Sequence, residues 1–137
     1  PSFGVYAKQT IKNAKVLEQE LKKYGFKLMF GGTDNHMVLV DVFSSKGVTG
    51  KEVEKALDKI GITVNKNMIP DDHRKPMDPS GVRIGVPAIT TRGMKEKEVK
   101  IIASWINRAV ENQADEKELA TLHKEVIKLC KRFPLPS

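Results

Sequence analysis

Arg83 is a candidate ligand-binding side chain because of the short apolar segment around it. It lies between Val82 and Ile84, and glycines at positions 81 and 85 flank the three residues. We expect a short strand here, with glycines that let other groups approach the backbone closely. An arginine on a strand presents a rigid fork of donors that suits bidentate binding of a carboxylate. The same pattern also fits a surface arginine or one half of an internal ion pair.

The polar stretch from Asn65 to Ser80 precedes this arginine and contains three prolines. A loop of this length in a compact domain is usually functional or disordered, and the prolines and short apolar pieces argue against disorder. Asn65 and Asn67 carry amides that can hydrogen-bond a polar heterocycle, although asparagines in loops more often cap the backbone. We expect Lys66 to be solvated and residues 71–75 to form an exposed turn.

The remaining reactive side chains show no pattern of a metal site or a nucleophile. His36, His73 and His123 lie far apart without metal-ligand spacing. Cys130 borders an apolar helical stripe, and we expect it to be partly buried and inert, so no Cys–His pair is indicated. The glycine pairs are too short for a phosphate-binding loop. Arg92 either docks a neighbouring domain or is solvated.

The elements that position these residues follow from apolar spacing and caps. A capping box of Thr49 and Glu52 begins one helix and Gly61 ends it, and a cap of Asp115 and Glu118 begins the last helix. The segment 36–43 is hydrophobic almost throughout, which is typical of a strand covered on both faces. Helices around a small sheet predict a small α/β sandwich in one domain, residues 1–137. The helices are expected at about 6–24, 49–60, 95–112 and 116–132, the strands at 26–30, 36–43, 62–64 and 82–84, a turn at 31–35 and irregular segments at 65–80 and 85–93.

Composition limits the class of protein. The chain has 137 residues, 39% apolar and 30% charged, which indicates one globular domain. No apolar run approaches the roughly 20 residues that span a bilayer, and no signal peptide precedes the first helix. A single cysteine excludes an internal disulfide framework and favours a reducing compartment, so we expect the cytoplasm. A chain that begins at Pro1 rather than Met is expected to be processed or truncated.

The net charge of +7 and the pI of about 9.5 raise the question of nucleic-acid binding. However, the basic residues are spread along the chain with acidic residues between them, and no aromatic and basic stripe occurs. Lysine-rich, solvated helix faces therefore explain the charge better than a nucleic-acid surface does.

Several runs of residues occur together in an order that is specific to one enzyme family. They are Gly31-Gly32-Thr33-Asp34-Asn35-His36 leading into Val38-Leu39-Val40-Asp41, Thr49-Gly50-Lys51-Glu52, Gly61-Ile62-Thr63-Val64, the run from Asn65 to Asp72, Pro76, and the run from Ser80 to Gly93. In this order, over about residues 5–112, the chain resembles the C-terminal domain of serine hydroxymethyltransferases.

The resemblance implies a pyridoxal-phosphate enzyme that interconverts serine plus tetrahydrofolate and glycine plus 5,10-methylenetetrahydrofolate, with the cofactor as electron sink. By motif position, Arg83 resembles the arginine that binds the amino-acid carboxylate, and Asn67 the amide that contacts the folate ring. The implied fold is the small C-terminal domain of a fold type I pyridoxal-phosphate enzyme. Residues 1–25 would be a helix linking back to the large domain, and the complete enzyme a homodimer or homotetramer.

The sequence departs from the family at three places. Most members are expected to have threonine at the position of Val86, and threonine or serine at the position of Met68. We expect these apolar side chains to tune the site without abolishing it. The family's Thr-Thr-His-Lys segment, which carries the cofactor lysine, does not occur in this sequence. This chain alone is therefore expected to hold no covalent cofactor and to have no transferase activity.

Two other functions stay open at this point. A stand-alone module derived from the same domain would bind an amino acid or another carboxylate through Arg83 without catalysis. A basic RNA-binding domain has only the net charge in its favour.

Overall fold

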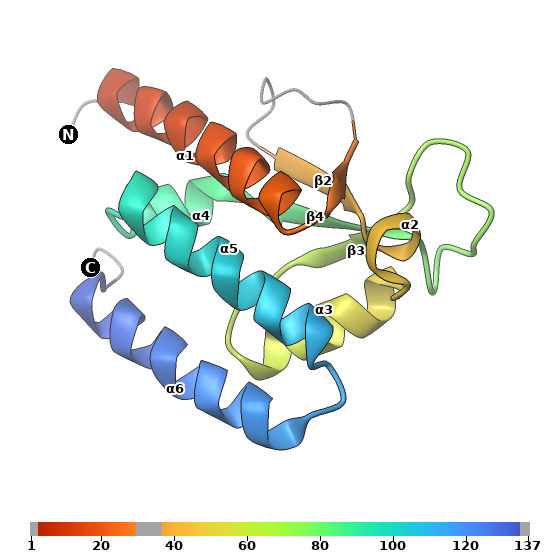
Figure 1. Cartoon of the computed structure of the whole chain (residues 1–137). Helices are drawn as coiled ribbons and strands as arrows, with labels where there is room; N and C mark the ends of the chain where they lie inside the picture. Colours follow the sequence, from red (N-terminus) through yellow and green to blue (C-terminus); the bar gives the residue numbers. More distant parts are fainter. Residues whose placement is uncertain (1–2, 30–36, 135–137) are drawn as a thin grey trace.

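The computed structural model describes residues 3–29 and 37–134, and these residues form a mixed helical and antiparallel domain (Figure 1). The helices carry most of the chain, and the strands are short. The helices are α1 (Phe3–Lys23), α2 (Val42–Lys46), α3 (Gly50–Lys59), α4 (Val86–Thr91), α5 (Glu96–Glu111) and α6 (Glu116–Arg132); the strands are β1 (Lys27–Leu28), β2 (Met37–Asp41), β3 (Asn65–Asn67) and β4 (Gly81–Gly85).

The four strands form one sheet in the order β1-β2-β4-β3, with every neighbouring pair antiparallel. β4 is therefore an inner strand, hydrogen-bonded on both sides. Its central residue, Arg83, is the register partner of Leu39 in β2 and of Asn65 in β3. Residues directly opposite each other in an antiparallel pair point to the same face, so this register decides which side chains surround Arg83.

The core lies on one face of this sheet, under the helices. α1 and α5 run side by side, and α6 returns along α5 (Figure 1). The apolar stripes of these helices pack against the inward-facing residues of β2 and β4. The fully buried side chains include Leu17, Leu21, Val40, Leu57, Val82, Val99, Leu119 and Leu122.

The capped helices confirm what the sequence predicts locally. The hydroxyl of Thr49 accepts a hydrogen bond from the backbone N–H of Glu52 at 3.2 Å, and the Glu52 carboxylate accepts from the N–H of Thr49 at 2.9 Å. Gly61 follows the helix with a φ of +89°, a conformation that favours glycine. Asp115 accepts from the N–H of Glu118 and begins α6 as predicted.

Several predicted elements are wrong. The strand predicted at 36–43 ends at Asp41, whose carboxylate caps α2 by accepting from the N–H of Ser44. The strand predicted at 62–64 does not form, and the strand lies at Asn65–Asn67 instead. The segment 85–93 contains α4 rather than irregular structure. Phe30, His36 and the turn 31–35 lie outside the described residues.

For the part of the chain that the structure describes, the expectation that β2 is covered on both faces is also wrong. Val38 and Val40 are buried in the core, whereas Met37 and Leu39 on the other face are partly exposed. The sheet thus has a helical face and an open face, and the open face is the one that carries Arg83.

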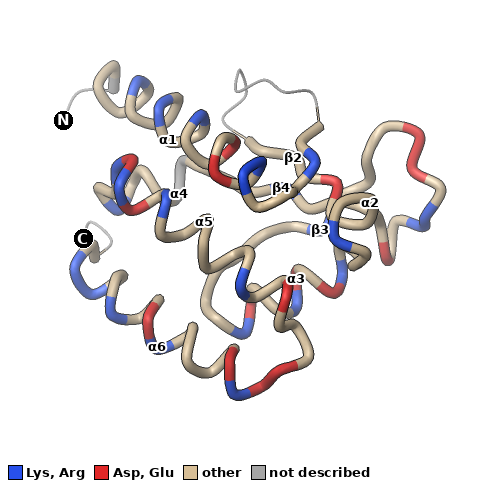
Figure 2. Tube along the Cα trace, in the orientation of Figure 1, with Lys and Arg blue, Asp and Glu red and all other residues tan. Residues whose placement is uncertain are grey.

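Acidic and basic residues are interleaved along α1, α3, α5 and α6, whereas α4 carries no charged residue (Figure 2). No helix among the described residues is both long and apolar enough to cross a bilayer.

Candidate functional site

Arg83 occupies the middle of β4 and points away from the core. Its neighbours Val82 and Ile84 are 2% and 3% exposed, whereas Arg83 itself is exposed. This alternation is the period-two pattern of a strand with one buried face. Among the described residues, Arg83 makes no hydrogen bond or ion pair, so the internal ion pair is excluded there, and a surface arginine and a ligand-binding arginine are the two interpretations that agree with its exposure. Its guanidinium donors are available to a ligand.

The open face around Arg83 is built from the two strands that pair with β4. Leu39 and Asn65 flank Arg83 directly, and Met37 and Asn67 lie one pair further along in opposite directions. One end of this surface is therefore apolar at Met37, the Asn65 amide lies beside Arg83 in the middle, and the Asn67 amide lies at the other end. A ligand with a carboxylate and a polar ring can contact the charged centre and the amide end together.

The two asparagines lie on β3, not in a loop as predicted. Asn65 is exposed, and Asn67 donates from its side-chain Nδ2 to the carbonyl oxygen of Met68 at 2.8 Å. The backbone capping that the sequence leaves open is thus present at Asn67. Lys66 points to the opposite face and is not free in solvent, because its N–H and its ammonium both contact the Glu54 carboxylate, at 2.9 Å and 3.4 Å.

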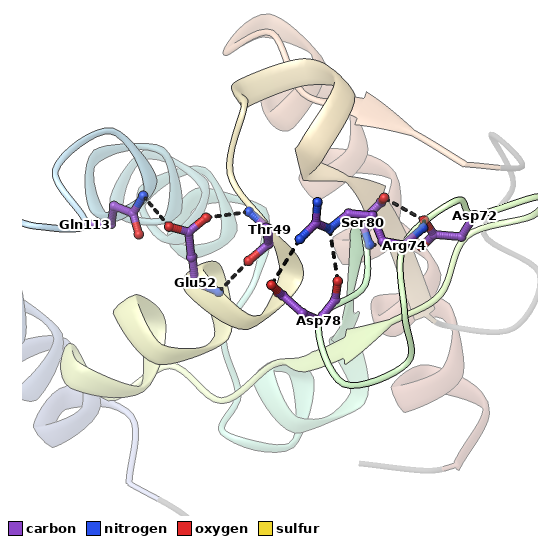
Figure 3. Close-up of polar contacts among 7 residues, drawn as sticks. All are labelled: Thr49, Glu52, Asp72, Arg74, Asp78, Ser80 and Gln113. Carbon is purple, nitrogen blue, oxygen red and sulfur yellow. Dashed lines mark hydrogen bonds and ion pairs between the residues drawn. The ribbon is translucent and has the colours of Figure 1, made fainter.

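The loop that joins β3 to β4 is held by a carboxylate that the sequence analysis assigned to an exposed turn. Asp72 accepts from the Ser80 hydroxyl at 2.7 Å (Figure 3). It also accepts from the N–H of Ser80 at 2.9 Å, from the N–H of Arg74 at 2.9 Å and from the N–H of Ile69 at 3.3 Å. The predicted exposed turn is therefore wrong for Asp72 and Arg74, whereas Asp71 and His73 are exposed. The contact from Asp72 to the backbone two residues on is a turn that aspartate commonly forms, and it was detectable from the sequence.

Arg74 closes the other side of the same loop. It donates to the carbonyl oxygen of Asp78 at 3.0 Å and to the Asp78 carboxylate at 3.1 Å (Figure 3). Its guanidinium lies 4.7 Å from the centre of the Phe43 ring. The Pro79 carbonyl accepts from the N–H of Gly50 at 2.7 Å. The loop is consequently anchored to α2 and α3 and is ordered by side chains within it.

The electrostatics of the loop follow from these contacts. Burial alone raises the pKa of Asp72, but the hydrogen bonds from Ser80, Arg74 and Ile69 outweigh it and lower the pKa to about 2 from an ordinary 3.8. Asp72 is therefore an anion throughout the neutral range and serves as a fixed acceptor.

The two departures from the family pattern occupy different environments. Val86 is fully buried in the core and does not face the open side of the sheet. Met68 is partly buried and directly follows Asn67. Of the two positions, only Met68 is placed to influence the candidate site.

The remaining candidate residues lie away from Arg83. Cys130 is partly buried, as predicted, and Arg92 donates to the carbonyl oxygen of Phe133 at 3.1 Å, tying the end of α4 to the end of α6. In residues 3–29 and 37–134, no three His, Cys, Asp or Glu side chains come together as metal ligands. A largely apolar cavity of about 460 Å³, lined in part by Trp105, lies between α4, α5 and α6. Neither Arg83 nor Asn67 lines it.

The chain is similar to known proteins of one family. The model of the family described as serine hydroxymethyltransferase matches residues 1–106. The chain is 51% identical over 135 residues, 98% of its length, to the serine hydroxymethyltransferase of Acidobacterium capsulatum, and equally so to that of Koribacter versatilis. These alignments cover 31% and 32% of the two relatives, so the chain spans about a third of their length. The chain belongs to the serine hydroxymethyltransferase family.

Proposed function

We propose that this chain is the small C-terminal, substrate-binding domain of an enzyme that interconverts serine plus tetrahydrofolate and glycine plus 5,10-methylenetetrahydrofolate. The observation that carries the proposal is the exposed guanidinium of Arg83, which has no partner among the described residues and lies on an open sheet face. Membership of the family supplies the reaction, and the geometry supplies a role for this part of the enzyme.

Arg83 is proposed to bind the carboxylate of serine or glycine. Both oxygens of a carboxylate match the planar fork of a guanidinium, and the two charge-assisted hydrogen bonds fix the orientation as well as the position of the amino acid. β4 is paired on both sides, so the backbone beneath Arg83 is held rigidly. A rigid base lowers the entropy lost when the substrate is oriented.

Asn67 is proposed to contact the ring system of the folate. An amide offers one acceptor oxygen and two donor hydrogens, which suits a heterocycle with both kinds of group. One of those hydrogens is occupied by the Met68 carbonyl, which leaves the oxygen and the second hydrogen for the ligand. Asn67 is the register partner of Gly81, two residues before Arg83 on the same face, so the two ligands would lie side by side.

The residues present fit a partial role toward pyridoxal phosphate. On the strands beside β4, the open face carries the amides of Asn65 and Asn67 and the apolar side chains of Met37 and Leu39, and no amine that could bind the cofactor covalently. The cofactor, when bound, supplies the electron sink for bond cleavage at the amino-acid substrate. This chain would hold the substrate carboxylate, and the rest of the enzyme would hold the cofactor.

The proposed domain organisation follows from α1. Residues 1–137 would form the single small domain, with the helix at residues 1–25 leading back to the large domain, although most of α1 packs against α4 and α5. The complete enzyme is proposed to be a homodimer or homotetramer.

The test is the activity of the complete protein. Cloning the reading frame that contains Pro1 and assaying its product for tetrahydrofolate-dependent conversion of serine to glycine should show turnover, whereas the 137-residue chain alone should show none. A complete protein without that activity would contradict the proposal. If the reading frame holds only this domain and the chain binds serine by itself, a stand-alone carboxylate-binding module is the correct function.

A further inference from the structure

The Met68–Ile69 peptide group connects Asp72 to the candidate folate contact. The carbonyl oxygen of Met68 accepts from Asn67 Nδ2 at 2.8 Å. The N–H on the other side of the same peptide, that of Ile69, donates to Asp72 Oδ2 at 3.3 Å. A peptide group is planar and rigid, so the orientation of its N–H fixes the orientation of its carbonyl. The Asp72 carboxylate is therefore linked to the Asn67 amide through this one rigid peptide group.

Asp72 is itself fixed from the opposite end of the loop. The same Oδ2 accepts from the N–H of Ser80, and Oδ1 accepts from the Ser80 hydroxyl and from the N–H of Arg74. Ser80 is 4% exposed and immediately precedes β4. The Asp72 carboxylate thus joins Ile69, near the start of the loop that follows β3, to Ser80, the last residue before β4.

Packing at the base of the loop leaves little freedom for a different arrangement. A Cβ placed on Gly81 would lie 2.7 Å from Ile69 Cγ2 and 2.9 Å from the carbonyl oxygen of Asn67. The Ile69 side chain is therefore pressed onto β4 while its N–H is held by Asp72. Both contacts fix the peptide that orients Asn67.

We propose that Asp72 is a positioning residue for the folate subsite: through the Met68–Ile69 peptide it holds the side-chain amide of Asn67 with its Oδ1 acceptor directed to the ligand. This inference rests on the proposed function. The carboxylate does not touch substrate. It sets the rotamer of an amide that does, so its loss should weaken folate binding and leave serine binding at Arg83 largely intact.

The experiment uses the complete enzyme and a matched pair of substitutions. Asp72→Asn removes the negative acceptor, whereas Asp71→Asn makes the same change one residue earlier, at an exposed position with a φ of +58° that asparagine tolerates. We expect Asp72→Asn to raise the KM for tetrahydrofolate about five- to tenfold, since a charge-assisted hydrogen bond is lost, with the Kd for serine unchanged within about twofold. Asp71→Asn should change neither constant.

A double-mutant cycle separates positioning from general loosening of the fold. If Asp72 acts through Asn67, Asp72→Asn should have almost no further effect on the folate KM in an Asn67→Ala background. Ser80→Ala removes only the 2.7 Å contact to Asp72 and should give a smaller change in the same direction, which keeps the test informative if Asp72→Asn folds poorly. Additive effects in the cycle, or equal losses of serine and folate binding, would overturn the inference. If the wild-type enzyme shows folate-dependent turnover of serine and the folate KM is unaltered in both Asp72→Asn and Ser80→Ala, the inference is overturned and the proposed function stands. If the wild-type protein shows no folate-dependent turnover, the proposed function on which the inference rests is itself wrong.

Discussion

Asn13 and Thr90, 77 residues apart in the sequence, are joined by a hydrogen bond of 3.0 Å between two buried side chains. The same Asn13 nitrogen also donates to the carbonyl oxygen of Met94 at 3.0 Å, and its oxygen accepts from Gln9 at 3.0 Å. Asn13 is 0% exposed. This amide fastens α1 to α4, the short helix that directly follows the strand of Arg83.

Replacing Asn13 should therefore lower the free energy of unfolding by more than the loss of an ordinary exposed polar contact would. Asn13→Ala leaves the buried Met94 carbonyl without a donor, and an unsatisfied buried group costs about 1–3 kcal/mol. Urea unfolding of the 137-residue chain measures the change. Lys15→Ala, at an exposed position on the same helix, should change the free energy of unfolding by less than about 0.5 kcal/mol. Equal stability of the two variants would show that Asn13 does not hold α1 in place.

Glu18 on α1 predicts a pH dependence of stability. Burial raises the pKa of this carboxyl above its ordinary 4.5, with Lys22 partly opposing the effect. Because the folded pKa is the higher one, the free energy of unfolding is greatest below pH 4.5 for this group and falls as the pH rises through the folded pKa. Glu18→Gln should thus be more stable than the wild type at neutral pH and lose that advantage toward pH 4.5.

The measurement for Glu18 is the urea midpoint at several pH values. Glu20→Gln is the control: the Glu20 side chain is 14% exposed, but its partner Lys23 is 71% exposed, and solvent screening limits an ion pair with such a partner to about 1 kcal/mol. A neutral-pH stability for Glu18→Gln below that of the wild type would mean that the ionised carboxylate is stabilising.

The lowered pKa of Asp72 predicts the opposite pH dependence of stability. Its folded pKa of about 2 lies below the ordinary 3.8, so its contribution to stability is complete above about pH 5 and is lost as the pH falls through 2. The free-energy difference between the wild type and Asp72→Asn should therefore be constant near neutral pH and shrink in the acid range. A difference that persists unchanged at pH 2 would show that the charge of Asp72 does not stabilise the loop.

Two glycines on β4 make a matched pair for steric effects. A Cβ on Gly81 would lie 3.0 Å from the Val40 carbonyl and 2.7 Å from Ile69, whereas a Cβ on Gly85 meets only the Met37 side chain at 3.7 Å. Gly81→Ala should lower the free energy of unfolding by about 1–3 kcal/mol or more through overpacking, and Gly85→Ala should be tolerated. Thermal unfolding of both variants tests this, and a Gly81→Ala variant as stable as Gly85→Ala would disprove the close contact.

The features that the sequence predicts correctly are those set by nearby residues. The Thr49–Glu52 box and the Asp115 cap act within one turn of their helices, and Val82, Arg83 and Ile84 alternate as their strand requires. The strand at Asn65–Asn67 was misplaced because its polar residues have low strand propensity and form a strand by pairing with β4. The apolar run up to Phe43 predicts a strand of that length, but β2 ends at Asp41. The Ser80 carbonyl accepts hydrogen bonds from the N–H groups of Val42 and Phe43, where the chain enters α2.

The candidate site shows the same division. Arg83 was identified from its own segment, but the role of Asp72 depends on Ser80, eight residues away, and on a peptide group whose orientation no local pattern specifies. Only its turn contact to Arg74 is local. The structure was needed to connect Asp72 with Asn67.

The central claim is that Arg83 binds the carboxylate of the amino-acid substrate, and the Kd for serine of the complete enzyme, measured by calorimetric titration, tests it most directly. Arg83→Ala should weaken binding by about 2–5 kcal/mol, at least roughly thirtyfold, and Arg83→Lys should not restore it because an ammonium lacks the fork. Arg108→Ala, which breaks ion pairs to Glu118 and Glu125 on the helical side, should bind serine normally. If Arg83→Ala binds serine as the wild type does, the carboxylate is held elsewhere and the assignment of this site is wrong.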